Sequence, residues 1–276
     1  MLMLKLPTNS ARRSTTLALI ACWAAPLLLT ASAGCDVITA DLRHTERSEW
    51  RRTYELSATG RVEINNVNGK IDVEPSTGQN VEVVAVKIAR GATPELAKEA
   101  LGRADITEDA SRDLVRLTTK YARSGGWLHG QNVQVEYTVK VPPAAEVKFV
   151  TVNGGVNVTG LSGRVTAETT NGGVVARNVS GAIEAGTTNG GVDVELTRVA
   201  EGGAKLECTN GGIKLRLPQD AKATISASVT NGGIDTGGLT VEATESSRRR
   251  FEGKLNGGGP SIRISGTNGG ITISAR

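Results

Sequence analysis

VTAETTNGGVVARNVSGAIEAGTTNGGVDVEL, residues 165–196, contains two copies of one short unit, and this unit decides the fold. Six Asn-Gly-Gly tripeptides of the chain are followed directly by Val or Ile, and they are separated by steps of 18, 18, 21, 21 and 37 residues. A near-constant period predicts a repeat architecture, in which neighbouring units bury each other's apolar faces. The predicted turn residues are Asn153, Gly154, Gly155, Asn171, Gly172, Gly173, Asn189, Gly190, Gly191, Asn210, Gly211, Gly212, Asn231, Gly232, Gly233, Asn268, Gly269 and Gly270.

Each unit predicts two short β-strands, one on either side of the tripeptide. Before the Asn, small or apolar residues alternate with polar ones, as in Val165, Ala167 and Thr169. After it the alternation resumes, as in Val174 and Ala176. A period of two residues predicts strands with one buried face.

Two arrangements of these strands fit the alternation. Asn-Gly between alternating strands is a strong signal for a two-residue hairpin, which would give an antiparallel meander. However, Thr precedes the Asn in five of the six units, and Gly occupies the second position after it in all six. Parallel strands in register stack like residues at about 4.8 Å and form Asn and Thr ladders. We therefore predict an all-β, parallel β-helix-like solenoid over residues 147–276, with the meander as the alternative.

The amino terminus has the order of a secretory signal peptide. Residues 1–34 contain three basic residues and no acid, then an apolar run that ends in small residues before Cys35. The run is interrupted by Pro26 and is shorter than the roughly 20 residues that a membrane-spanning helix needs. Ser32-Ala33-Gly34-Cys35 resembles a bacterial lipoprotein signal, which implies cleavage before Cys35 and lipidation of its thiol. We expect residues 35–50 to be a tether.

Charge and cysteine content narrow the function classes. The chain carries 32 basic and 28 acidic residues, and loss of the leader leaves 29 against 28. A nearly neutral chain with few aromatic residues has no electrostatic footprint for nucleic acid, so no nucleic-acid partner is expected. After cleavage only Cys35 and Cys208 remain, and no disulfide is expected.

Residues 51–146 predict a β-rich amino-terminal cap, or first layer, of the solenoid. Asn68-Gly69-Lys70 is a diverged copy of the repeated tripeptide, and residues 81–88 and 113–119 alternate like strands. A short helix is predicted to begin at Thr93-Pro94-Glu95, with Thr as its cap and Pro at its first position, and to end at Gly102. Atypical ends of this kind protect the open edges of a solenoid.

The Thr-Asn-Gly-Gly-(Val/Ile) units, Val67-Asn68-Gly69-Lys70-Ile71, Tyr137-Thr138-Val139-Lys140-Val141-Pro142 and Leu217-Pro218 together resemble a known family. It is the bacterial β-strand-repeat domain of unknown function that carries an adhesin label, and the resemblance covers roughly residues 55–276. The resemblance implies an all-β repeat domain in the cell envelope. Because the adhesin label is itself inferred from shape, it adds little about biochemical activity.

Few residues stand out as chemical sites. Only His44 and His129 are histidines, so neither a metal site nor a nucleophile with its base can be assembled, and no cofactor is expected. Trp127, in a Gly-rich loop, is the candidate partner contact, with packing on the cap as the alternative.

Charged residues offer two further candidates. Asp193, Lys214 and Asp235 share one outward position of the repeat, so Lys214 is expected to pair with both aspartates in a surface charge ladder, although the two carboxylates also suggest an inverting glycosidase. Arg248-Arg249-Arg250 predicts a solvated loop, or attachment to anionic envelope components.

Taken together, these features predict a non-catalytic binding or structural protein, adhesin-like, exported to the bacterial cell envelope and held at the membrane by a lipid anchor. Its expected partner is an envelope protein or polysaccharide. The alternatives are a carbohydrate-active enzyme on a β-helix and an envelope-stress sensor that pairs with a membrane protein.

Overall fold

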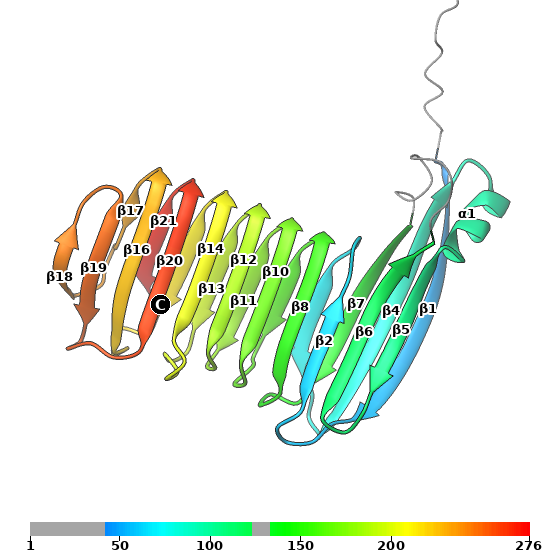
Figure 1. Ribbon diagram of the computed structural model, residues 1–276, viewed down its shortest axis with the longest axis horizontal. Helices are drawn as coiled ribbons and strands as arrows, with labels where there is room; N and C mark the ends of the chain where they lie inside the picture. The colour runs from blue at the N-terminus through cyan, green and yellow to red at the C-terminus, as the bar shows by residue number, and fades with distance from the viewer. Residues whose placement is uncertain (1–41, 123–132) are drawn as a thin grey trace, which may run out of the picture. The chain divides into compact units, whose positions relative to one another are not determined.

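The computed structural model of the protein describes residues 42–122 and 133–276 (Figure 1), which form two β-sheets facing each other across an apolar core. Sheet A contains, in spatial order, β1 (His44–Glu55), β4 (Asn80–Gly91), β7 (Val133–Val141), β3 (Ile71–Pro75), β9 (Val156–Thr159), β11 (Val174–Val179), β13 (Val192–Leu196), β15 (Ile213–Leu217), β21 (Ile271–Ala275) and β17 (Ile234–Asp235). Sheet B contains β18 (Val241–Ser246), β19 (Arg250–Leu255), β16 (Ala223–Asn231), β20 (Ser261–Asn268), β14 (Ala204–Asn210), β12 (Ile183–Asn189), β10 (Val165–Asn171), β8 (Glu146–Asn153), β2 (Arg61–Asn65), β6 (Leu114–Tyr121) and β5 (Ala104–Ala110).

The repeating element is a rung, which we define as one strand of sheet B, a glycine turn, and the next strand of the chain in sheet A. Successive rungs pair in parallel and in register, so that Val165 of β10 lies opposite Val147 of β8 and Ile183 of β12. In sheet A, Val174 lies opposite Val156 and Val192 in the same way. The predicted parallel solenoid is therefore confirmed, and the antiparallel meander is wrong for these units.

The rungs do not stack in the order of the chain. The rung β20–β21, formed by the last residues, lies between β14–β15 and β16–β17 (Figure 1). At the other end, β2–β3 lies between β8–β9 and the pair β6 and β7. The 37-residue step between Asn231 and Asn268 thus brings the chain from the outer rung β16–β17 back to a position between that rung and β14–β15. The order of the chain predicted that β16–β17 would pair with β14–β15. This prediction is wrong, because β20–β21 pairs with β14–β15 instead.

The core is built from the alternating residues of both sheets. Val147, Phe149, Leu206 and Ile264 point inward from sheet B, and residues such as Leu215 meet them from sheet A. Full burial of one Val, Leu, Ile or Phe side chain contributes about 1.5–3 kcal/mol. The repeat of this contribution along the stack explains why no single rung needs a large aromatic core.

Glycine is required at the first position after each Asn. Gly190 has φ of +147°, and a Cβ there would lie 1.9 Å from the carbonyl oxygen of Gly172 on the neighbouring rung. Gly191, the second glycine, has more room, because its Cβ would lie 3.5 Å from the carbonyl oxygen of Gly212. This difference explains why Lys70 can occupy the second position in the diverged unit.

The asparagines form one continuous ladder along the turn. The Nδ2 of every ladder asparagine after Asn68 donates to the Oδ1 of the adjacent unit over 2.7–2.9 Å. In spatial order the ladder consists of Asn68, Asn153, Asn171, Asn189, Asn210, Asn268 and Asn231. Just inside it, the buried hydroxyls of Thr151, Thr169 and Thr187 donate to the glycine carbonyls of the preceding rung. Side-chain amides and hydroxyls thus satisfy polar groups that the turn would leave exposed or unpaired.

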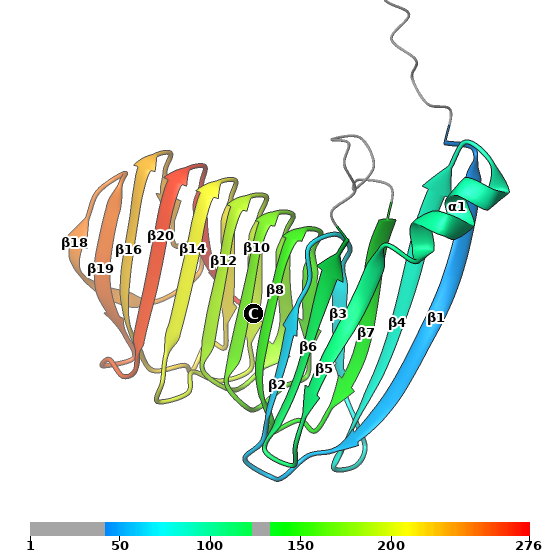
Figure 2. The ribbon, with the colours of Figure 1, turned by 45° about the vertical axis from the view of Figure 1, so that its right-hand side comes forward.

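Antiparallel strands close both ends of the stack. β1 and β4 extend sheet A beyond β7, β5 extends sheet B beyond β6, and the hairpin β18–β19 covers β16. Helix α1 (Pro94–Leu101) packs beside β4 and β1 (Figure 2), with Thr93 as its N-cap and Gly102 as its C-cap, as predicted. Residues 44–50, which the sequence places in a tether, form the first part of β1 and pair with β4.

Replacing a first-position glycine should destabilise the fold much more than replacing its neighbour. Gly190→Ala is expected to lower the free energy of unfolding by roughly 2 kcal/mol or more, because the left-handed backbone and the approach of the Gly172 carbonyl both exclude a methyl group. Gly191→Ala, the matched control, should change it by less than about 1 kcal/mol. Urea denaturation of both variants measures the difference, and equal losses would contradict this account of the turn.

Candidate functional site

Several residues singled out in the sequence lie outside the described part of the chain. Cys35 and the leader precede residue 42, and Trp127 and His129 fall in the segment 123–132. The turn asparagines and glycines lie at the ends of the sheet B strands, and their hydrogen bonds join the rungs to one another. They therefore have a structural part in the fold, and the outer faces of the two sheets are the candidate binding surfaces.

The outward charge column of sheet A differs from its prediction. Lys214 lies between Asp193 and Thr272, not between Asp193 and Asp235, because β20–β21 lies between β14–β15 and β16–β17. The two aspartates are thus three rungs apart, roughly 14 Å, which is too far for the pair of carboxylates of a glycosidase. The expected bridge from Lys214 to both aspartates is wrong.

Asp193 is instead held by two arginines. Both Nη atoms of Arg177 donate to its carboxylate, at 2.9 and 2.5 Å, and Nη2 of Arg216 donates to Oδ1 at 3.0 Å. Arg216 and Arg276 also form ion pairs with Glu195. The hydrogen bond from Arg177, with the charges of both arginines, lowers the pKa of Asp193 below its ordinary value. This network ties rungs together and leaves no carboxylate available for chemistry.

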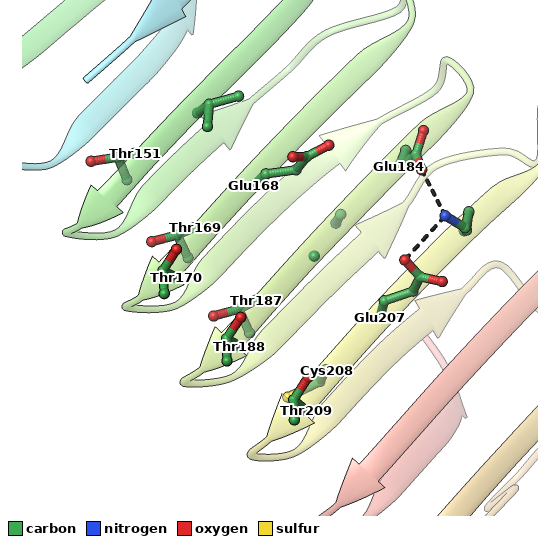
Figure 3. Close-up of a pocket in the computed structure, with 14 residues that line it drawn as sticks. Thr151, Glu168, Thr169, Thr170, Glu184, Thr187, Thr188, Glu207, Cys208 and Thr209 are labelled. Carbon is green, nitrogen blue, oxygen red and sulfur yellow. Dashed lines mark hydrogen bonds and ion pairs between the residues drawn. The ribbon is translucent and has the colours of Figure 1, made fainter. Parts of the chain in front are cut away.

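The outer face of sheet B contains an open groove centred on Gly186. Gly186 lies opposite Glu168 on β10 and Glu207 on β14, so the missing side chain leaves a hollow between two carboxylates (Figure 3). The hollow has a volume of about 440 Å³. Its lining comes from four adjacent strands, β8, β10, β12 and β14.

The charges of the groove are three carboxylates and one ammonium. Lys205 Nζ contacts Glu184 Oε1 at 2.9 Å and Glu207 Oε2 at 3.0 Å, and the hydrogen bond to Glu184, followed by that to Glu207, raises the pKa of Lys205. Glu168, by contrast, has no hydrogen-bond or ion-pair partner among the described residues. The groove therefore carries a formal charge of −2 and has one carboxylate free to accept hydrogen bonds from a ligand.

A row of exposed threonines forms one lip of the groove. Thr170, Thr188 and Thr209 precede the turn asparagines of β10, β12 and β14 and line the hollow (Figure 3). The row continues on the next two rungs with Thr267 and Thr230. Hydroxyl groups that recur at the rung spacing of about 4.8 Å present the same hydrogen-bonding group many times to one side of the sheet.

This arrangement can bind polar ligands but offers little to a reaction. The side chain of Glu207 is 54% exposed and Glu168 is also exposed, so neither carboxylate lies in the apolar surroundings that a general acid needs. Within residues 42–122 and 133–276, no group of three or more His, Cys, Asp and Glu side chains could hold a metal ion. In that same part of the chain, no helix is long and apolar enough to cross a membrane.

The sequence contains a signal for the groove in one outward column of the repeat. Glu168, Gly186 and Glu207 share one outward position of the repeat, three residues before the Asn. A glycine flanked by two long side chains in an outward column predicts a hollow once parallel stacking is accepted. The pairing of Lys205 with Glu184 and Glu207 was harder to find, because it depends on rotamers.

The fold and the groove define a parallel two-sheet β-solenoid with antiparallel ends and a polar outer face. The chain belongs to the toastrack DUF4097 family, whose model matches residues 56–274. No curated protein matches it.

Solved structures with some likeness have adhesion-related names. One is a "putative cell adhesion protein" from Clostridium sporogenes, 13% identical, with a TM-score of 0.44 over 84% of this chain and 100% of the other. Another is a "putative adhesin" from Bacteroides fragilis, 12% identical, with a TM-score of 0.38 over 83% of this chain and 97% of the other. Likeness at this level carries no argument about function.

The Asp193 network should make stability depend on pH in a defined direction. Because the folded pKa of Asp193 lies below 3.8, its contribution is fully present above pH 3.8 and is lost as the pH falls through the folded value. Asp193→Asn should therefore be less stable than the wild type at neutral pH, and the gap should close on acidification. Denaturation at a series of pH values measures the gap. Asp220→Asn, an exposed aspartate, is the control and should show no such gap.

Proposed function

We propose that this protein is exported, is anchored in the bacterial cell envelope through a lipid on Cys35, and binds an envelope polysaccharide with the outer face of sheet B. The observation that supports binding is the open groove at Gly186, bordered by carboxylates and hydroxyls that recur along the rungs. The leader and Ser32-Ala33-Gly34-Cys35 support the anchor.

A polymer suits this surface better than a small molecule does. Sites for small molecules are concave and bury most of the ligand, whereas this groove is open along a flat sheet. Polar groups at a constant spacing can make the same contact with successive units of a chain, which adds affinity through multiple weak contacts. Sugar hydroxyls both donate and accept, so they match the carboxylate of Glu168 and the hydroxyls of Thr170 and Thr188.

Catalysis is the second candidate, and one observation favours it. Glu168 and Glu207 lie two rungs apart, about 9.6 Å, close to the upper end of the separation used by inverting glycosidases. Their exposure argues for binding instead, since a glycosidase needs one carboxyl group to remain protonated at working pH. If the groove were catalytic, Glu168→Gln and Glu207→Gln would each abolish hydrolysis of a bound polysaccharide.

Filling the groove should weaken binding without disturbing the fold. A Cβ on Gly186 would come no closer than 3.9 Å to the carbonyl oxygen of Glu207, so Gly186→Gln is expected to fold normally and to project into the hollow. We expect roughly tenfold weaker binding to insoluble polysaccharide isolated from the envelope, measured as a co-sedimentation isotherm with protein lacking the leader.

Thr138→Gln is the matched control, because it lengthens an exposed side chain on the outer face of the other sheet, sheet A. Its binding should equal that of the wild type. Equal binding by Gly186→Gln, or equal losses in both variants, would contradict the assignment of this surface. Failure of the polysaccharide to bind, with an envelope protein captured in a Gly186-dependent manner instead, would show that the ligand class is wrong.

The lipid anchor has an independent test. Labelled palmitate should be incorporated into the wild type and into Cys208→Ser, because Cys208 is buried in the core, but not into Cys35→Ser. Loss of the label should also release the protein from the membrane fraction. Equal labelling of all three proteins would refute lipidation at Cys35.

A further inference from the structure

We infer that Asn231-Gly232, at the end of the asparagine ladder, is a site of spontaneous deamidation, whereas the interior Asn-Gly pairs of the ladder are protected. In this reaction the main-chain nitrogen of Gly232 loses its proton and attacks Cγ of Asn231. A new C–N bond closes a succinimide ring, and Nδ2 leaves as ammonia after taking up a proton. Water then opens the ring to give aspartate or isoaspartate, so the overall change is one water consumed and one ammonia released.

An interior unit shows what holds the reaction back. Nδ2 of Asn189 donates to Asn171 Oδ1 at 2.9 Å, and its Oδ1 accepts from Asn210 Nδ2 at 2.9 Å. The attacking group is held as well, because the Gly190 N–H donates to the main-chain oxygen of Asn210 at 2.9 Å. Ring closure would have to break these bonds, and the close approach of Gly190 to the Gly172 carbonyl leaves little room for the turn to rearrange.

Asn231 has fewer of these restraints. Its Nδ2 donates to Asn268 Oδ1 at 2.8 Å, but among the described residues no group donates to its own Oδ1 and none accepts from the Gly232 N–H. The reason lies in the order of the rungs. Because β20–β21 lies inside the stack, Asn231 is at the end of the ladder, and the hairpin that covers β16 supplies no further Asn.

The opposite end of the ladder is different. The Gly69 N–H donates to the main-chain oxygen of Asn153 at 2.8 Å, and Asn68 Oδ1 accepts from Asn153 Nδ2. The nucleophile is therefore held at Asn68 and not at Asn231. A pair outside the ladder, Asn256-Gly257, has its Nδ2 engaged with the carbonyls of Gln219 and Ala221, and it provides a comparison for the experiment.

Deamidation at Asn231 would act on the terminal rung. A carboxylate cannot donate to Asn268 Oδ1, so the last bond of the ladder would be replaced by two facing acceptors. Isoaspartate would also add a methylene group to the main chain next to Gly232, where even a Cβ would lie 1.8 Å from the Gly269 carbonyl oxygen. The expected result is loosening of β16–β17 while the inner rungs keep their bonds.

The test is peptide mapping by mass spectrometry of the intact mature protein, incubated folded at mildly alkaline pH. Asn231 should be converted about tenfold or more faster than Asn210 and Asn268, since the inner sites must give up additional hydrogen bonds. The three sites share the local sequence Thr-Asn-Gly-Gly-Ile, so they should react at similar rates in urea. That comparison separates the effect of the fold from the effect of sequence.

Two results would overturn the inference. One is conversion of Asn231 no faster than that of Asn210 and Asn268 in the folded protein, and the other is conversion confined to Asn256. The variant Asn231→Ala gives an independent check. It removes the Nδ2 that donates to Asn268 Oδ1, but it leaves the Gly269 N–H bonded to the main-chain oxygen of residue 231. Asn268 should then react faster than in the wild type, but by less than the wild-type difference between Asn231 and Asn268. No change at Asn268 would show that the ladder bond itself gives no protection.

Discussion

The approach of one main chain to the next at the glycine turn is the constraint on which the structure depends. At every first-position glycine of the repeats, a Cβ would lie between 1.6 and 2.3 Å from the carbonyl oxygen of a neighbouring rung. Only glycine permits this approach, and it brings the preceding asparagines and threonines into hydrogen-bonding range. The ladder, the register of both sheets and the alignment of the outer columns all follow from it.

Much of this fold could be predicted from the sequence, because the repeat records which residues stack on which. The identity of residues in the Asn, Gly and Thr columns indicated parallel strands, and Thr93-Pro94 indicated the helix. The order of the rungs could not be predicted. The rungs containing Asn231 and Asn268 both have small or apolar residues at the inward positions before the turn, so either could pair with β14–β15, and the choice depends on how residues 236–260 cross the stack.

The groove was partly predictable for the same reason. The position of the hollow follows from the repeat, since parallel pairing in register aligns Glu168, Gly186 and Glu207. Its charge distribution could not be predicted, because the carboxylates that Lys205 contacts depend on the side-chain rotamers. The bridge expected at Lys214 failed on one side because the inserted rung places Thr272 where Asp235 was expected, and on the other because Asp193 pairs with Arg177 and Arg216.

The inserted carboxyl-terminal rung has a mechanical consequence. Strands at the margin of a sheet can be peeled away by breaking hydrogen bonds on one side, whereas β20 is paired with strands on both sides and β21 is paired on both sides at Ile271 and Thr272. A pull on the tail of the chain would free residues 273–275 from β15 alone, and beyond them it would have to break two sets of bonds at once, from Thr272 back through β20. Under tension, a last strand that is paired on both sides should therefore resist unfolding better than a last strand at the margin of a sheet would.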